Sequence, residues 1–229
     1  MGFLTQRFVP NTIDVVKTGR FPSTIPALRA ELLSDHRISS RKFVTDFIPK
    51  GGIGAELGVF TGLFSTILLR HTAAERIYFV DPWWEAFGEH YPDWGTYTGN
   101  GKLRTRSAYE AATSRIGKLK KRTQAEIIVG TADVFLKSVP DGYLDWVYLD
   151  STHSYEGTQI ELDLLKDKLK PGGVVVGDDW HDDAAHPHSG VSKAVREAVL
   201  AGHFEMIGTF DALQWAIRST DDHSVSDNG

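Results

Sequence analysis

The sequence predicts an α/β protein built on a doubly wound sheet of seven strands, mostly parallel, with an antiparallel C-terminal strand. Short β-branched runs alternate with longer stretches of helical apolar spacing from about residue 53 to residue 200, a pattern typical of parallel strands joined by helical crossovers. The central runs, such as IIV and VVV, are continuously apolar, as expected for strands covered on both faces. The last two runs are separated by Asp211 and Ala212 alone, which leaves room only for a hairpin.

Each element follows from its own pattern. The apolar runs predict strands at residues 53–59, 76–82, 125–130, 144–150, 173–179, 204–210 and 213–218. Apolar residues at helical spacing predict helices at about 63–68, 106–122, 134–136, 155–169 and 191–199. Residues 1–50 carry no such alternation and are expected to form an N-terminal helical cap, over the mouth of the site or against a partner subunit, which leaves a homo-oligomer open. Residues 51–219 form the main domain and residues 220–229 a polar tail.

Composition narrows the function classes. Hydrophobic residues make up 41% of the 229 and charged residues 24%, which is typical of a globular domain and not of a disordered chain. The chain has no cysteine, which excludes a disulfide scaffold, a thiolate zinc site and a cysteine nucleophile. The net charge is −5, which argues against a nucleic-acid partner. The longest apolar runs are too short to span a membrane, and we expect a cytoplasmic protein.

Acidic residues gather where the predicted parallel strands end. In open α/β sheets, ligands bind beyond the carboxyl ends of the strands. Four of the five parallel runs end at an acid or carry one in the closing turn, and the acids are Glu56, Asp81, Asp150, Asp178 and Asp179. Because clustered carboxylates repel one another, this distribution indicates a functional edge.

The first strand leads into a glycine-containing turn, Glu56 to Gly62, that opens directly into a helix. Phe60 or Thr61 fills the middle position of a G-x-G-x-x-G fingerprint, which disfavours the pyrophosphate of a dinucleotide. Asp81 ends the second strand about twenty residues later and is placed to accept both hydroxyls of a ribose. A nucleoside without phosphates is therefore the better ligand.

Five motifs in order resemble the class I S-adenosylmethionine-dependent methyltransferases, whose fold is Rossmann-like, over roughly residues 50–218. They are Glu56-Leu57-Gly58 with Gly62, Asp81-Pro82, Leu149-Asp150 with Lys170-Pro171-Gly172-Gly173, the stretch from Asp150 to Glu156, and Gly177-Asp178-Asp179-Trp180. The last two are similar to the small-molecule O-methyltransferases of the catechol and macrolide-sugar types. The resemblance implies contacts to the cofactor from Glu56, Gly58, Phe60, Gly62, Asp81, Gly130, Thr131, Ala132, Asp133 and Asp150. Within that set, Gly58 would lie under the methionine part, Asp81 would hold the ribose, and Gly130 to Asp133 would flank the adenine.

Asp150, Asp178 and Asp179 end two adjacent predicted strands and are expected to converge. Two or three carboxylates completed by water suit Mg²⁺, or Ca²⁺ or Mn²⁺. The metal-dependent O-methyltransferases hold Mg²⁺ at similar positions. A carboxylate that contacts cofactor or substrate without a metal is the alternative.

His153 and Asp150 are the predicted catalytic pair. His153 follows Asp150 by three residues, where the catechol-type enzymes carry a catalytic lysine, and histidine is a natural general base near neutral pH. It could instead bind the metal or a backbone carbonyl. His181, His186 and His188 follow on the same edge, either as a softer site for iron or zinc together with Asp178 or as a solvated polar lid.

Six aromatic residues crowd the segment after Asp81: Trp83, Trp84, Phe87, Tyr91, Trp94 and Tyr97. They could stack on adenine, wall an acceptor pocket, or belong to the core or an interface.

The predicted function is methyl transfer from S-adenosylmethionine to a small-molecule hydroxyl with a divalent metal. The alternatives are an NAD-dependent oxidoreductase and a non-methylating protein of this fold, such as an iron hydroxylase.

Overall fold

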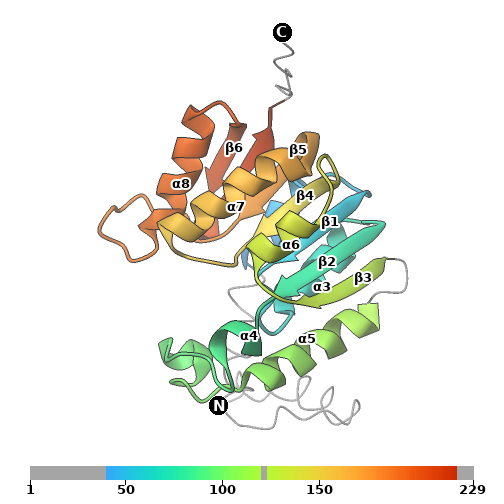
Figure 1. The fold of residues 1–229 in the computed structure, drawn as a ribbon, viewed down its shortest axis with the longest axis vertical. Coiled ribbons are helices and arrows are strands. Elements are labelled where there is room, and N and C mark those ends of the chain that lie inside the picture. The colour runs from blue at the N-terminus through green and yellow to red at the C-terminus, as the bar shows by residue number, and fades with distance from the viewer. Residues whose placement is uncertain (1–39, 120–122, 221–229) are drawn as a thin grey trace.

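A computed structural model describes residues 40–119 and 123–220, and it confirms the predicted architecture (Figure 1). The seven strands are β1 (Ile53–Leu57), β2 (Arg76–Asp81), β3 (Gln124–Val129), β4 (Leu144–Leu149), β5 (Leu169–Gly177), β6 (Phe204–Phe210) and β7 (Gln214–Ser219). They lie in the order β3-β2-β1-β4-β5-β7-β6. β1 to β5 are parallel, and β7 pairs antiparallel with both β5 and β6.

Helices cover both faces of this sheet. They are α3 (Leu63–His71), α4 (Trp84–Phe87), α5 (Thr105–Leu119), α6 (Ala132–Ser138), α7 (Tyr155–Lys168) and α8 (Ser189–Leu200). α7 packs against both α6 and α8 on one face, while α3 packs against α5 on the other (Figure 1). The arrangement is the one expected when right-handed crossovers join parallel strands.

The two cores follow from the two-residue period of a strand. On β2, Tyr78 and Val80 belong to the core under α6, α7 and α8, whereas Ile77 and Phe79 belong to the core under α3 and α5. β4 divides in the same way. Because both faces are buried, the inner residues of these strands form continuous apolar runs, IYFV in β2 and WVYL in β4.

Two differences from the predicted element bounds have a clear structural cause. β5 begins at Leu169 instead of residue 173, because Leu169 pairs with Leu144 of β4 before the glycine pair. The link between β6 and β7 has three residues, Asp211–Leu213, and not two. Ala212 and Leu213 both take positive φ there, at 56° and 62°, so the turn needs one residue more than a tight hairpin.

The predicted N-terminal cap lies mostly outside the described residues. Its described part contains a short 3₁₀ helix, η1 (Lys42–Asp46), whose Val44 is buried against the core under α3. Nearly all of the predicted tail, residues 221–229, also lies outside the described part. Within residues 40–119 and 123–220, none of the helices is both long and apolar enough to span a membrane.

Gly58 is the glycine on which the edge of the sheet depends most. Its φ is +95°, and a Cβ atom there would stand 1.9 Å from the backbone oxygen of Asp150. We expect Gly58→Ala to lower the free energy of unfolding by at least about 3 kcal/mol, because a backbone clash adds to the strain of a positive φ.

Gly142→Ala is the matched control in urea denaturation. Gly142 has a similar φ of +61° but nothing within 4 Å of its added Cβ, so only the conformational cost of about 1 kcal/mol applies. Equal losses in the two variants would contradict the predicted contact between the loops.

Candidate active site

The strand order reverses between β1 and β4, so the crevice predicted for a ligand lies beyond these two strand ends. The loops that leave them are held together by backbone hydrogen bonds. The Gly58 N–H donates to the Val80 oxygen at 2.9 Å, and the Asp150 N–H donates to the Leu57 oxygen at 2.8 Å. The glycine turn and Asp150 therefore sit side by side, as the sequence predicted.

Asp81 faces the glycine turn. Its Oδ2 accepts the N–H groups of Val59 at 3.0 Å and Phe60 at 2.8 Å, and its Oδ1 accepts that of Trp83 at 2.9 Å. Burial raises the pKa of Asp81 although these three bonds lower it. The carboxylate thus fixes the loop. Because Oδ1 accepts only one of the three hydrogen bonds, it can still accept another from a hydroxyl group.

Glu56 lies beneath the same turn and is 1% exposed. Its Oε2 accepts the Ser65 hydroxyl at 2.5 Å, and burial raises its pKa well above the usual value. Ser65 is on the first helical turns of α3, so this bond ties the end of β1 to the helix that follows it.

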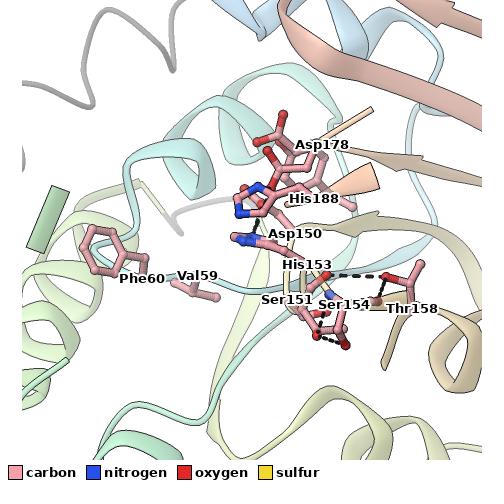
Figure 2. A network of polar contacts seen from close by, with 12 residues as sticks. Val59, Phe60, Asp150, Ser151, His153, Ser154, Thr158, Asp178 and His188 are labelled. Carbon is pink, nitrogen blue, oxygen red and sulfur yellow. Dashed lines mark hydrogen bonds and ion pairs between the residues drawn. The ribbon is translucent and has the colours of Figure 1, made fainter. Parts of the chain in front are cut away.

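A single cavity of about 480 Å³ joins the glycine turn to the acidic end of the site. The first part of its lining comes from the turn after β1 and the end of β2: Glu56, Gly58 to Thr61, Leu63, Phe64, Asp81 and Pro82. The second part comes from four aromatic residues, Phe87, Tyr91, Trp94 and Tyr97, and the third from Arg41, Asp150, Ser151, His153, Asp178, Asp179 and His188. Gly62, a predicted cofactor contact, does not line the cavity. Figure 2 shows Val59 and Phe60 across from the cluster that contains Asp150, His153, Asp178 and His188. A volume of this size suits a small-molecule ligand.

The aromatic segment divides between cavity and core. Tyr97 stacks on Phe60 with ring centroids 4.6 Å apart, so it extends the wall of the glycine turn. Trp83 is fully buried in the core and donates from Nε1 to the Phe60 oxygen. The segment therefore contributes residues both to the cavity wall and to the core, and contact with a cofactor or acceptor stays a prediction.

Arg41 lies in the middle of the carboxylate cluster. Its guanidinium forms an ion pair with Asp178 and lies 3.4 Å from Asp150, and its side chain is 4% exposed. Asp178 also accepts the Gln214 side-chain amide on Oδ1 at 2.6 Å. Two of the three predicted metal ligands are thus already engaged by a buried cation.

Asp150, Asp178 and Asp179 do come together, with one oxygen from each within 4.8 Å of the others. Their donor type suits a hard divalent cation. Such an ion would have to replace Arg41 at Asp150 and Asp178, so the three carboxylates fit the predicted metal only if Arg41 moves away.

Asp179 faces a different set of partners. Its Oδ2 lies 3.1 Å from His153 Nε2 and 3.3 Å from His188 Nδ1. Its Oδ1 lies 4.0 Å from His181 Nε2. The site therefore has a guanidinium–carboxylate half and an imidazole–carboxylate half.

The charge around His153 sets its protonation. Burial lowers the pKa of His153, but its hydrogen bond to Asp150 and the charges of Asp150, Asp179 and Asp178 outweigh this and raise the pKa to about 9. In this arrangement the ring is protonated at neutral pH, so it can act as a base only when that negative charge is neutralised.

The residues predicted to flank an adenine lie at the same edge of the sheet but outside the cavity lining. The Gly130 N–H donates to the Asp81 oxygen at 3.1 Å, and Thr131 donates to Asp133 at 2.6 Å. Gly130 to Asp133 thus border the Asp81 loop, and their contact with a cofactor stays a prediction.

The sequence patterns do not single out Arg41 or Gln214, and they indicate His188 only together with the other two histidines of its loop. Arg41 precedes the first strand and Gln214 begins the last, so neither belongs to a strand-end motif. The three histidines after the fifth strand did signal His188, but sequence spacing could not show that its Nδ1 lies 3.3 Å from Asp179 Oδ2.

Glu161 of α7 is a buried carboxyl group behind the site. Its Oε1 accepts the Ser151 hydroxyl at 2.6 Å, and it is 5% exposed. Burial raises the pKa of Glu161 to about 7, against the lowering effect of the Ser151 bond. The folded protein therefore binds this proton more tightly than the unfolded chain does.

We expect wild-type stability to fall, relative to Glu161→Gln, as the pH rises from about 4.5 through 7, by at most about 3 kcal/mol. Urea denaturation at pH 5, 6, 7 and 8 measures the difference. Glu156→Gln, at an exposed position on the same helix, is the control. A difference between wild type and Glu161→Gln that does not change with pH would contradict the buried, neutral carboxyl group.

Comparison with known proteins supports the same reading of the fold. The model of a family described as a methyltransferase domain matches residues 53–180. The comparison with curated proteins gave no match.

Three solved structures illustrate the likeness. A protein from Corynebacterium glutamicum has a TM-score of 0.56 at 11% identity, with 94% of this chain and 99% of that chain covered. A SAM-dependent methyltransferase from Methanosarcina mazei has a TM-score of 0.51 at 14% identity, with 78% and 97% covered. A chain assigned as an rRNA methylase, from Clostridium thermocellum, has a TM-score of 0.52 at 13% identity, with 79% and 95% covered. At these identities the likeness shows the shared fold.

Proposed function

The chain belongs to the methyltransferase-domain family, and from this premise we propose that it transfers a methyl group from S-adenosylmethionine to a hydroxyl group of a small molecule. One observation carries the proposal: a single cavity is lined at one part by the glycine turn and Asp81 and at another by Asp150 and His153. A cofactor bound at the turn and an acceptor bound at the acidic end would meet inside it.

The glycine turn and Asp81 are the cofactor half. Asp81 holds the Val59 and Phe60 N–H groups, which fixes the loop, and its Oδ1 is placed to accept a ribose hydroxyl. Bound S-adenosylmethionine supplies a methyl group already activated by its sulfonium. The protein's task is then to hold the acceptor oxygen close and in line, which is worth up to about 7–11 kcal/mol in favourable cases.

Asp150 and His153 are the acceptor half, where the hydroxyl proton must be removed. Both line the cavity, with His153 Nε2 3.6 Å from Asp150 Oδ1. A divalent cation is part of the proposal, held at the carboxylate–imidazole end of the cavity, where it would lower the pKa of a hydroxyl group as it does that of water. The three carboxylates Asp150, Asp178 and Asp179 converge at this end and are the ligands that the sequence predicts, but Arg41 engages Asp150 and Asp178.

Several features support a small acceptor over the alternatives. The four aromatic residues narrow the cavity to small-molecule dimensions. The acidic net charge of −5 is unfavourable for RNA or DNA. The family match and Phe60 in the turn weigh against a dinucleotide-dependent oxidoreductase.

The test is a transfer assay with radiolabelled S-adenosylmethionine, untagged protein and added divalent ions. Sugar, catechol and polyketide hydroxyl compounds are the acceptors, each paired with its amine analogue, and a structured RNA is included as a macromolecular acceptor. Label on a hydroxyl compound is expected. Label on the amines or the RNA alone would contradict the proposed acceptor while leaving methyl transfer intact.

A further inference from the structure

We propose that His153, Asp179 and His188 form a binding site for a divalent transition-metal ion of the Fe²⁺ or Co²⁺ class. The proposal deepens the proposed function, on which it depends for the role of the ion in catalysis, whereas binding of the ion can be measured without turnover.

The spacing of the three donor atoms is the first argument. His153 Nε2 and His188 Nδ1 lie 3.1 Å and 3.3 Å from Asp179 Oδ2. Nitrogen and oxygen donors bound to one metal at about 2.1 Å, at angles near 90° to 110°, lie about 3.0–3.4 Å apart. All three donor atoms lie within 4.8 Å of one another, so one ion could take all three once the side chains adjust around it.

The second argument is that Arg41 and the two histidines contact different carboxylates. Arg41 and Gln214 hold Asp178, and Arg41 also approaches Asp150. Asp179 Oδ2 lies close to the two imidazoles instead, and the φ of Asp179 is 62°, which residues other than glycine rarely adopt. An ion at Asp179 thus leaves the Arg41 contacts in place, unlike an ion held by the three carboxylates.

The donor chemistry decides the class of ion. Two imidazoles and one carboxylate favour borderline transition metals over Mg²⁺ or Ca²⁺, which prefer oxygen donors alone. His153, Asp179 and His188 all line the cavity, so such an ion would remain open to a hydroxyl group of the acceptor. With His153 on the ion, Asp150 is the group beside it that can take the proton.

The three donors come from separate elements. His153 lies in the loop after β4, Asp179 is the second residue after β5, and His188 immediately precedes α8. The rings of His153 and His188 are 4.5 Å apart between centroids, so they already face one another (Figure 2). His188 and His153 have side chains 37% and 43% exposed, and replacing either by alanine should leave the fold intact.

The test is a Co²⁺ titration of untagged protein that has been stripped with a chelator. Visible absorption bands of Co²⁺ report nitrogen and oxygen ligands directly. We expect 1:1 binding, with His188→Ala and His153→Ala each weakening it by at least about 10- to 100-fold. His203→Ala, outside the cavity lining, should bind Co²⁺ as the wild type does.

Asp178→Asn separates the two ligand sets, because Asp178 belongs only to the three-carboxylate set. The mixed site predicts unchanged Co²⁺ affinity in this variant, and Asp150→Asn serves the same purpose if Asp178→Asn fails to fold. Weaker binding in these variants with no effect of His188→Ala would overturn the mixed site, as would no Co²⁺ binding by the wild type.

Calorimetric titration of the same proteins with S-adenosylmethionine keeps this proposal apart from the proposed function. Cofactor binding without Co²⁺ binding overturns only the metal site. Co²⁺ binding without cofactor binding overturns only the methyl transfer.

Discussion

Replacing His153 by alanine should lower the rate of methyl transfer by about 10²–10⁴-fold while leaving the affinity for S-adenosylmethionine unchanged. His153 lines the acidic end of the cavity, away from Asp81 and the glycine turn, and contacts Asp150 and Asp179. Its loss removes a group that either takes the acceptor's proton or binds the ion that acidifies it. The cofactor half of the cavity is untouched.

Single-turnover measurements at saturating cofactor give the rate, and calorimetry gives the affinity. His203→Ala, an exposed histidine next to β6, controls for removal of an imidazole. A near-wild-type rate in His153→Ala would remove this residue from the chemistry, and a parallel loss of cofactor affinity would show a general disturbance of the site.

Asp81→Ala should weaken binding of S-adenosylmethionine by about 100-fold or more. The carboxylate accepts three backbone N–H groups, and each buried donor left without its acceptor costs about 1–3 kcal/mol. The turn would then lose its fixed shape, and the ribose would lose its predicted acceptor. If two of these hydrogen bonds are lost at a cost near the lower end of that range, the binding free energy falls by about 3 kcal/mol, which is about a 100-fold increase in the dissociation constant.

Asp93→Ala is the matched control for Asp81→Ala. Asp93 is an exposed carboxylate on the same aromatic segment and accepts one backbone N–H, from Gly95, at 2.9 Å. It should leave the dissociation constant unchanged. If Asp81→Ala binds the cofactor as tightly as the control does, the assignment of the cofactor half is wrong.

The fold was predictable because its signals are local. The run VVV is apolar at every position, since β5 is buried on both faces. The run IIV is also a strand, but it belongs to the edge strand β3, whose residues are half-buried or exposed. The link after β6 is too short for a crossover between parallel strands whether it has two residues or three, so it predicts a hairpin. The bounds of β5 were harder, because Pro171 and the two glycines after it look like a turn, while the strand pairs with β4 on both sides of them, at Leu169 and again from Val174, with a shift of register between.

The site was predictable as a set of strand ends, since parallel strands bring their carboxyl ends to one edge. Asp81, Asp150 and Asp179 all proved to be there. The sequence could not show which cationic side chain pairs with which carboxylate. Arg41 approaches from before the first strand and divides the carboxylates into two groups, and such a contact, 109 residues apart from Asp150, leaves no trace in local spacing.

The balance of charge at this edge of the sheet explains why its carboxylates are compatible both with a metal site and with ion pairs inside the protein. Three carboxylates at one edge repel one another and need positive charge. The protein supplies it from Arg41 on one side and from His153 and His188 on the other. An entering cation must therefore compete with a guanidinium or bind alongside the imidazoles.

The most direct measurement is calorimetric titration of the purified chain with S-adenosylmethionine, S-adenosylhomocysteine and NAD. The two sulfur nucleosides should each bind with one-to-one stoichiometry, and NAD should give no binding heat, because Phe60 stands where a pyrophosphate would need a glycine. Saturable binding of NAD with none of either sulfur nucleoside would contradict the central claim that the turn and Asp81 hold a nucleoside without phosphates.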